Sequence, residues 1–177
     1  MHRLVATALV ASSVLVFGCG AQQRPDGGEG LLPVGAAAPD LAAPDQNGKA
    51  HHVAEERGHA LIVYFYPKDG TPGCTKEACA FRDAWAKFQA ANVQIYGVSA
   101  DGGASHADFA KVQKLPFPIL ADPDHTWSKA FGVGTTLGMD SRVSFLIDKD
   151  GKVARVYPDV DPGVHADQVL KDAAELH

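Results

Sequence analysis

An uninterrupted apolar run, Leu61 to Tyr66, is the clearest hydrophobic pattern along this chain, and an amphipathic stretch follows it. The run has the length and the β-branched and aromatic content of a buried strand, and Pro67 through Gly73 then break any regular structure. From there on, apolar positions recur at spacings of four, three, four and three, which marks one face of a helix; they are Cys74, Ala78, Phe81, Trp85 and Phe88. The pattern predicts a helix from about Cys74 to Ala91, with Cys74 in its first turn and on its inward face.

The segment after that helix, Val93 to Ser99, is a second candidate for a buried strand. Strand, helix and strand make a βαβ unit, in which the strands are parallel and the crossover is right-handed. The loop that carries Cys74 then lies at the carboxyl ends of the strands. This is the edge that active sites favour in open α/β sheets.

The remaining elements are predicted from shorter patterns. Asn47-Gly48 predicts a β-hairpin near the start of the domain, and Asp148-Lys149-Asp150-Gly151 predicts a second hairpin, which implies an antiparallel strand pair. Residues 132–140 have the composition of a loop, and Asp124 is one possible cap of the helix that follows it. The other expected elements are helices at about 104–114, 126–131 and 164–176 and strands at 119–120, 143–147 and 152–157.

This order of elements, strand–helix–strand followed by strand–strand–helix, predicts an α/β protein with a thioredoxin-like fold, in which helices flank a central mixed sheet. The N-terminal β-hairpin is an extension of that plan. We expect one folded domain over residues 34–177, because the chain has 177 residues and a hydrophobic content of 46%, which is enough for a substantial core.

The first residues have the composition of an export signal. His2 and Arg3 precede an apolar stretch, Leu4 to Phe17, and small residues follow at Gly18-Cys19-Gly20. The stretch is shorter than the roughly 20 apolar residues that a membrane-spanning helix needs, which disfavours the alternative of a permanent transmembrane anchor. In addition, Val16-Phe17-Gly18-Cys19 resembles the lipobox of bacterial lipoproteins.

That resemblance implies that residues 1–18 are a signal peptide and that Cys19 becomes the lipidated first residue of the mature protein. Residues 19–33, which are rich in Gln, Gly and Pro, then form a flexible tether between the membrane and the domain. We therefore expect an exported protein that a lipid anchor at Cys19 holds at a membrane, facing the periplasm or another extracytoplasmic side.

Charge and histidine content argue against nucleic-acid binding and against a metal site. The net charge of -5 and the pI near 5.8 leave no basic patch, so nucleic acid is not an expected partner. The eight histidines form no HExxH or CxxC…H pattern, and His51-His52 are expected on a solvated hairpin. We therefore expect neither a metal nor another cofactor.

The three cysteines divide by position. If Cys19 is lipidated, Cys74 and Cys79 are left for redox chemistry. Unpaired backbone N–H groups and the positive end of the helix dipole gather at a helix N-terminus and favour a thiolate at Cys74, and the thiolate is the reactive form of cysteine. The exported location alone would favour a structural disulfide, but the short spacing inside a helical pattern argues against it.

Motifs around Cys74 resemble those of one enzyme family. The pattern Pro67-x-x-x-Thr71-x-x-Cys74 matches the active-site pattern of the peroxiredoxins, which are thiol peroxidases. The surrounding residues, 66–83, look like the signature of the Q-type subfamily, also called bacterioferritin comigratory proteins. Similarity covers roughly residues 34–170, with further matching stretches at 115–118, 122–125 and 142–148.

The resemblance implies a role for each matching residue. Cys74 is the peroxidatic cysteine, which peroxide oxidises to a sulfenic acid, and Cys79 is the resolving cysteine, which forms a disulfide with it. The Thr71 hydroxyl orients peroxide and thiolate, Arg142 holds both by charge-assisted hydrogen bonds, and Pro67 shields the sulfur from overoxidation. A thioredoxin-like donor then reduces the disulfide. A monomer is sufficient, because both cysteines lie in one chain.

Helix geometry adds one expectation. Five helical residues turn Cys79 about 140° around the axis from Cys74 and separate the two Cα atoms by about 8–9 Å. A disulfide tolerates about 7 Å at most. We therefore expect the helix to unwind locally after peroxide attack. Glu77 and Arg82 also match the subfamily signature, but the sequence assigns neither of them a role.

Two other functions are compatible with the same fold. A thiol–disulfide oxidoreductase is the enzymatic alternative, but the family with that activity carries Cys-x-x-Cys, and this chain has four residues between Cys74 and Cys79. A tethered binding module with a vestigial site is the non-enzymatic alternative. Peroxide consumption by the wild-type protein would separate both from a peroxidase.

Overall fold

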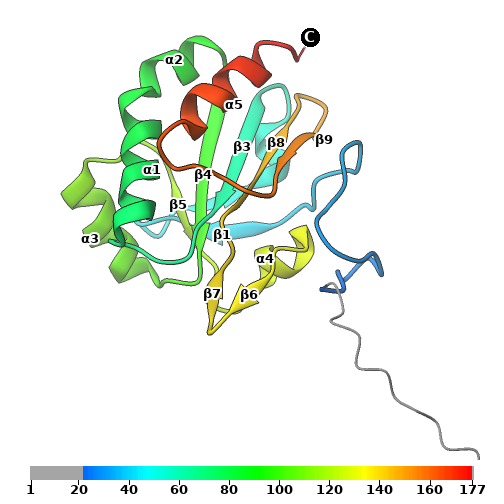
Figure 1. Cartoon of the computed structure of the whole chain (residues 1–177), viewed down its shortest axis with the longest axis horizontal. Helices are drawn as coiled ribbons and strands as arrows, with labels where there is room; N and C mark the ends of the chain where they lie inside the picture. The colour runs from blue at the N-terminus through cyan, green and yellow to red at the C-terminus, as the bar shows by residue number, and fades with distance from the viewer. Residues whose placement is uncertain (1–21, 177) are drawn as a thin grey trace, which may run out of the picture.

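A five-stranded mixed sheet forms the centre of the computed structural model, which describes residues 22–176 (Figure 1). The strand order is β5-β4-β3-β8-β9; β3, β4 and β5 are parallel, whereas β8 runs antiparallel to β3 and β9 antiparallel to β8. This is the predicted thioredoxin-like arrangement of a βαβ unit and a hairpin. The strands are β3 Ala60–Phe65, β4 Val93–Ser99, β5 Ile119–Ala121, β8 Val143–Ile147 and β9 Val153–Tyr157.

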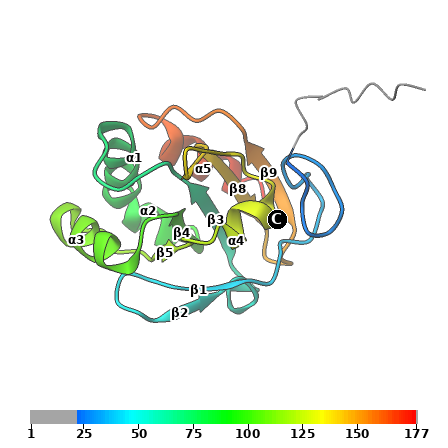
Figure 2. The ribbon, with the colours of Figure 1, turned by 90° about the horizontal axis from the view of Figure 1, so that it is seen from below.

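Helices cover both faces of the sheet, because side chains of the buried strand β3 alternate between two cores. Ile62 and Tyr64 point into a core with α1, α2, α3 and α5, and Val63 and Phe65 point into a second core with α4 and the N-terminal hairpin. In Figure 2, α1 and α5 lie on one side of the strands, and α4 and the hairpin lie on the other. The helices are α1 Pro72–Asp83, α2 Trp85–Ala90, α3 Gly103–Gln113, α4 Thr126–Phe131 and α5 His165–Ala173.

The helix expected from Cys74 to Ala91 is two helices, because the chain leaves helical geometry at Ala84, with φ -90° and ψ 0°. Cys74, Phe81 and Phe88 nevertheless belong to one core. Hydrophobic periodicity indicates only which face of a helix is buried. Because both helices bury the same face, the periodicity gives no sign of the break between them.

The expectation of a loop at residues 132–140 was also wrong. This stretch holds a small two-stranded sheet, β6 (Thr135–Thr136) and β7 (Met139–Asp140), joined through Leu137 and Gly138, which both have positive φ. Strands of two residues are too short for the alternation that identifies a strand in sequence.

Both predicted hairpins are present. Asn47-Gly48 lies in the turn between β1 (Ala42–Pro44) and β2 (Ala50–His52), and the second hairpin joins β8 to β9. His51, expected in solvent, is instead buried, and its Nε2 lies 3.0 Å from Oδ2 of Asp45. The alternation of side chains along this short strand turns His51 toward the sheet, where its ring packs edge-on against Tyr96. A 3₁₀ helix, Val53–Glu56, follows β2.

The cap of α4 also differs from the expectation. The carboxylate of Asp122, rather than that of Asp124, accepts hydrogen bonds from the N–H groups of Trp127 at 3.1 Å and Ser128 at 3.0 Å. The buried Asp122 thus satisfies two of the free donors at the start of the helix.

Residues 22–33, expected to belong to a flexible tether, pack against the domain. Leu32 is 3% exposed and its N–H donates to the carbonyl of Phe131 at 2.9 Å. The guanidinium of Arg24 donates to three backbone carbonyls of the same segment, those of Glu29, Gly30 and Leu31. The predicted signal peptide, residues 1–18, and Cys19 lie outside the described residues. Within the described part of the chain, none of the helices combines the length and the hydrophobicity that crossing a membrane requires.

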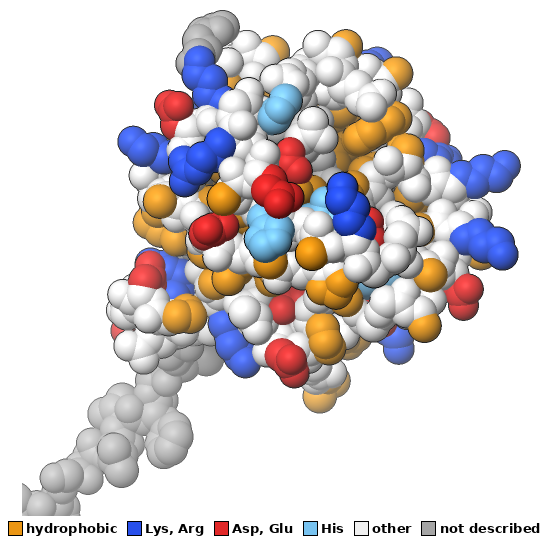
Figure 3. Space-filling view, turned by 180° about the vertical axis from the view of Figure 1, so that it is seen from behind, with side chains coloured by type: hydrophobic (Ala, Val, Ile, Leu, Met, Phe, Trp, Pro, Cys, Tyr) orange, Lys and Arg blue, Asp and Glu red, His pale blue; other side chains and the backbone are white. Residues whose placement is uncertain are grey.

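The surface carries both signs of charge. On the face shown in Figure 3, acidic, basic and histidine side chains are interspersed with apolar ones. Exposed large apolar side chains are few among residues 22–176; they are Val34, Val112, Leu137, Met139 and Val164.

Candidate active site

Cys74 lies in the first turn of α1, at the carboxyl end of the central strand β3. Thr71 is the N-cap and Pro72 the first helical residue, a position where proline loses no hydrogen bond. The first helical hydrogen bond runs from the N–H of Thr75 to the carbonyl of Thr71 at 2.8 Å. The N–H groups of Gly73 and Cys74 precede it, so they remain available as donors beside the thiol. Cys74 itself is only 1% exposed.

Arg142 approaches this thiol from the neighbouring strand. It directly precedes β8, whose first residue, Val143, pairs with Phe65 at the end of β3. The antiparallel pairing therefore delivers Arg142 to the edge of the sheet from which α1 starts. Its Nη2 lies 3.2 Å from the Sγ of Cys74. Gly73 leaves room for this guanidinium, because a Cβ atom there would lie 3.3 Å from Nη2.

Glu77, one turn after Cys74, holds the other side of the same guanidinium. Its Oε2 accepts a short hydrogen bond from Nη1 of Arg142, and the residue is 0% exposed. Burial raises the pKa of Glu77 to about 7, although Arg142 acts in the opposite direction. Partial burial would lower the pKa of Arg142, but its contacts with Cys74 and Glu77 outweigh that effect and raise it. Glu77 thus fixes the direction in which Nη2 points.

His165, in the first turn of α5, lies behind Glu77. Its Nε2 is 3.9 Å from Oε1 of Glu77 and 2.9 Å from the hydroxyl of Ser144. Burial, and secondarily Arg142, lower the pKa of His165 to about 4, so the ring is neutral at pH 7 and does not form an ion pair with Glu77. The sequence analysis missed His165. The available clue was a polar residue on the apolar face of an amphipathic helix.

Cys79 faces away from this cluster. It is partly buried, and its thiol donates to Oε1 of Gln113 on α3 at 3.5 Å. Arg82, one turn later, donates from Nη1 to the backbone carbonyl of Gln113 at 2.7 Å. Cys74 and Cys79 are both free thiols. The two sulfurs therefore contact different parts of the fold, the start of β8 and the end of α3.

The two remaining residues of the sequence motif lie just before α1. The hydroxyl of Thr71 donates to the carbonyl of Lys68 at 3.1 Å, which closes the turn that leads into the helix. Pro67 follows Tyr66 at the end of β3 and is partly buried. The structure thus brings Cys74 and Arg142 into contact and puts Thr71 and Pro67 on the loop beside them. The roles of Thr71 and Pro67 in catalysis stay predictions.

Comparison with known proteins decides the family. The model of the AhpC/TSA family matches residues 34–156, most of the chain. The chain belongs to this family. Among relatives, peroxiredoxin Q, chloroplastic, from Oryza sativa subsp. japonica is 41% identical over 145 residues, which are 80% of this chain and 67% of the relative. Putative peroxiredoxin bcp from Coxiella burnetii is 38% identical over 146 residues, covering 78% of this chain and 97% of the relative.

Solved structures of peroxiredoxins agree with this family assignment. Peroxidoxin BcpB from Mycobacterium tuberculosis superimposes with a TM-score of 0.77 at 33% identity, over 82% of this chain and 99% of that protein. The bacterioferritin comigratory protein of Xanthomonas campestris, studied for its alkyl peroxide reduction activity, has a TM-score of 0.73 at 33% identity, over 83% of this chain and 98% of that protein. The resemblance to the Q-type subfamily is thereby confirmed, and the chain is a thiol peroxidase.

Proposed function

We propose that this peroxiredoxin reduces hydrogen peroxide and organic hydroperoxides through a sulfenic acid on Cys74. The observation that carries this assignment is the 3.2 Å contact between Nη2 of Arg142 and the Cys74 sulfur. A guanidinium at this distance favours a thiolate, and its planar set of donors suits a peroxide oxygen as well. The alkyl peroxide reduction described for the Xanthomonas campestris relative supports the inclusion of organic substrates.

In the first step, the Cys74 thiolate attacks one peroxide oxygen. A sulfur–oxygen bond forms and the oxygen–oxygen bond breaks, so the sulfur is oxidised, and the released hydroxide or alkoxide takes up a proton to give water or alcohol. The N–H groups of Gly73 and Cys74 and the guanidinium of Arg142 are the donors toward the developing charge. Because the Thr71 hydroxyl donates its proton to Lys68, its lone pairs can accept from a peroxide O–H. Pro67 shields the sulfur from further oxidation.

In the second step, the Cys79 thiol attacks the sulfenic sulfur. The disulfide Cys74–Cys79 forms, the sulfur–oxygen bond breaks, and the hydroxyl leaves with the thiol proton as water. Both residues lie in α1, where helical spacing holds their Cα atoms about 8–9 Å apart. Because a disulfide tolerates about 7 Å at most, the first turns of α1 must unwind. A thioredoxin-like dithiol then supplies the two electrons that reduce the disulfide, and one chain is sufficient for the cycle.

Peroxide consumption tests this function. Wild type and three variants, Cys74→Ser, Cys79→Ser and Cys19→Ser, would be mixed with hydrogen peroxide and dithiothreitol. We expect only Cys74→Ser to lose activity, since dithiothreitol can reduce the sulfenic acid directly when Cys79 is absent. Cys19→Ser controls for the removal of a thiol outside the site. With thioredoxin in place of dithiothreitol, Cys79→Ser should also fail. Absence of consumption by wild type would overturn the proposal.

The proposal extends to location. The apolar stretch from Leu4 to Phe17 and the lipobox-like residues that end in Cys19 support export and lipid attachment. Since the chain packs against the domain from about Gln22 onward, a lipid on Cys19 would hold the enzyme close to the membrane surface. Labelling of bacterial cells with a radioactive fatty acid would test this: wild type should incorporate label and Cys19→Ala should not. Unlabelled wild-type protein would contradict the anchor.

A further inference from the structure

The helix α3 contacts the redox segment at two points that lie on either side of Cys74. The first contact is at Asp69, in the loop before α1. The second is at Cys79 and Arg82, inside α1. The stretch between the two contacts includes the turns of α1 that must unwind before the disulfide can form. One neighbouring helix therefore holds both ends of the segment that moves.

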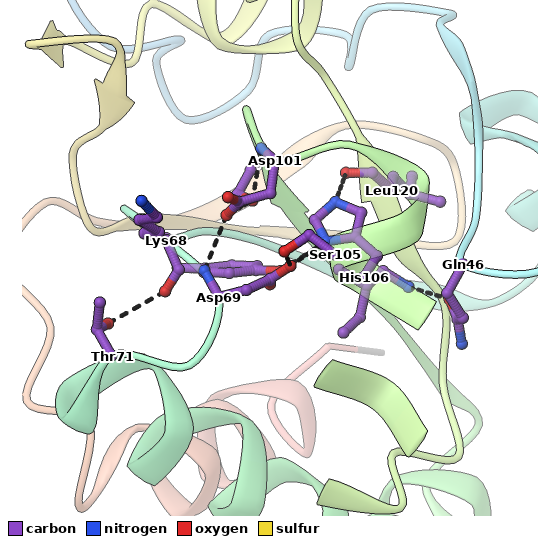
Figure 4. A network of polar contacts seen from close by, with 11 residues as sticks. Gln46, Lys68, Asp69, Thr71, Asp101, Ser105, His106 and Leu120 are labelled. Atoms are coloured by element: carbon purple, nitrogen blue, oxygen red, sulfur yellow. Dashed lines mark hydrogen bonds and ion pairs between the residues drawn. The ribbon is translucent and has the colours of Figure 1, made fainter. Parts of the chain in front are cut away.

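The first contact is a polar network around Asp69 (Figure 4). The carboxylate of Asp69 accepts hydrogen bonds from the hydroxyl of Tyr66 at 2.7 Å, from the hydroxyl of Ser105 at 2.7 Å and from Nδ1 of His106 at 2.8 Å. The backbone N–H of Asp69 donates to the carboxylate of Asp101 at 2.8 Å. Asp69 is thus held through both its side chain and its backbone. These bonds fix the loop that carries Pro67 and Thr71.

Both ring nitrogens of His106 are held by polar partners. The side chain is 0% exposed; Nδ1 lies 2.8 Å from the Asp69 carboxylate and 3.5 Å from the Tyr66 hydroxyl, and Nε2 lies 3.2 Å from the carbonyl of Leu120. Burial alone would raise the pKa of Asp69, but the hydrogen bonds from His106 and Tyr66 outweigh it and lower the pKa. Asp69 and His106 are therefore a hydrogen-bonded pair whose side chains are largely removed from solvent.

The second contact is weaker. The side chain of Gln113, the last residue of α3, accepts from the Cys79 thiol at 3.5 Å, and a thiol is a poor donor. Its backbone carbonyl accepts from Arg82. Cys79 can leave Gln113 without uncovering a buried charge. Separation of Asp69 from His106, in contrast, would take a hydrogen bond from a carboxylate that is only 7% exposed, which is more costly.

We propose that α3 is a two-point clamp on α1, in which the Asp69–His106 hydrogen bond is the permanent anchor of the active-site loop and the Cys79–Gln113 contact is the point that releases. This inference rests on the proposed Cys74–Cys79 disulfide. In the reduced enzyme the first contact keeps the loop of the peroxide site in place, and the second helps to keep α1 helical. After oxidation of Cys74, Cys79 leaves Gln113 while the loop at Asp69 stays in place, so that the helix can refold on the same support. Asp69, His106 and Gln113 are positioning residues, because they act through the loop and the helix.

Rapid-mixing fluorescence can separate peroxide attack on Cys74 from formation of the disulfide. The rate of the first step depends on the peroxide concentration, whereas the rate of the second does not. For Asp69→Asn and for His106→Asn, we expect peroxide attack to slow by about tenfold, the effect of one lost charge-assisted hydrogen bond. Disulfide formation should keep its wild-type rate in these variants, because the anchor is present before and after the helix unwinds. For Gln113→Leu, only disulfide formation should become faster. The anchor and the release point therefore act on different steps of the cycle.

Val153→Ala is the matched control, since Val153 is buried in β9 within the other core and its truncation lowers global stability. Neither rate should change in this variant. Unchanged rates in both Asp69→Asn and His106→Asn would overturn the anchor, and an unchanged rate of disulfide formation in Gln113→Leu would overturn the release point. Absence of the Cys74–Cys79 disulfide from oxidised wild type, detected by mass spectrometry, would overturn the proposed cycle and the clamp together.

Discussion

Arg142 and the buried Glu77 form an ion pair whose geometry directs one guanidinium nitrogen at the sulfur of Cys74. Nη1 donates to the Glu77 carboxylate, and Nη2 lies 3.2 Å from Sγ. A guanidinium is rigid and planar, so a partner on one edge determines what the other nitrogen faces. Glu77 therefore acts as a positioning residue for Arg142. This gives a physical reason for the carboxylate one helical turn after Cys74.

The bridge between Glu77 and Cys74 needs both guanidinium nitrogens, which leads to a prediction for Arg142→Lys. An ammonium group is a single point charge and cannot contact both partners in this geometry. We expect the rate of peroxide attack to fall by roughly 10- to 100-fold, the loss of one hydrogen bond to a charged group. Stopped-flow fluorescence measures it. Arg155→Lys, at an exposed ion pair between β9 and Glu175 just after α5, is the control. Equal rates for Arg142→Lys and wild type would contradict the prediction.

The raised pKa of Glu77 predicts a pH-dependent contribution to stability. Burial lifts the pKa from its ordinary 4.5 to about 7, so the folded state binds a proton that the unfolded state has released. The contribution of Glu77 is therefore most favourable below about pH 4.5 and is lost as the pH rises through about 7. Glu77→Gln does not titrate. In urea unfolding at pH 5, 7 and 9, its stability relative to wild type should rise with pH, and a constant difference would show that the carboxylate does not titrate in this range.

Hydrogen exchange tests the unwinding of α1. After oxidation by one equivalent of peroxide, amides of the first turns of α1, including those of Cys74 and Cys79, should exchange much faster than in the reduced enzyme, because the disulfide cannot form on an intact helix. Amides of α5, His165–Ala173, serve as the internal control and should keep their protection. Preserved protection across α1 in disulfide-bonded protein would show that the helix stays intact.

Loss of the hydroxyl should affect the free energy of unfolding differently at two neighbouring tyrosines, Tyr64 on β3 and Tyr66 in the loop after it. The buried Tyr64 hydroxyl has no hydrogen-bond partner among residues 22–176, and it lies over Gly97, where a Cβ would be only 2.7 Å away. The Tyr66 hydroxyl donates to Asp69 at 2.7 Å. Tyr64→Phe should leave the free energy of unfolding unchanged or raise it, whereas Tyr66→Phe should lower it by about 2 kcal/mol. Urea unfolding of the two variants side by side measures both, and a clear loss of stability in Tyr64→Phe would indicate a partner for its hydroxyl.

Local sequence patterns were sufficient for most of the fold. The run from Leu61 to Tyr66 is buried on both faces, as its composition indicates, and the turn residues Asp148 to Gly151 do join an antiparallel pair. Each of these patterns depends on side chains within one element. The break at Ala84 and the two-residue strands β6 and β7 were not visible for the same reason, since neither changes the periodicity of a whole element.

The candidate site divides in the same way. Sequence by itself determined that Cys74 lies in the first turn of a helix at the carboxyl end of a central strand, and the family resemblance pointed to Thr71 and Arg142. Only the tertiary structure decided which polar groups contact one another around the two cysteines. Glu77 contacts Arg142, Asp69 contacts His106 and Cys79 contacts Gln113, although 65, 37 and 34 residues separate these pairs in the sequence. Hydrophobic spacing specifies which face of an element is buried, but polar side chains acquire their partners only when packing removes them from water and limits them to the neighbours that the fold brings into reach.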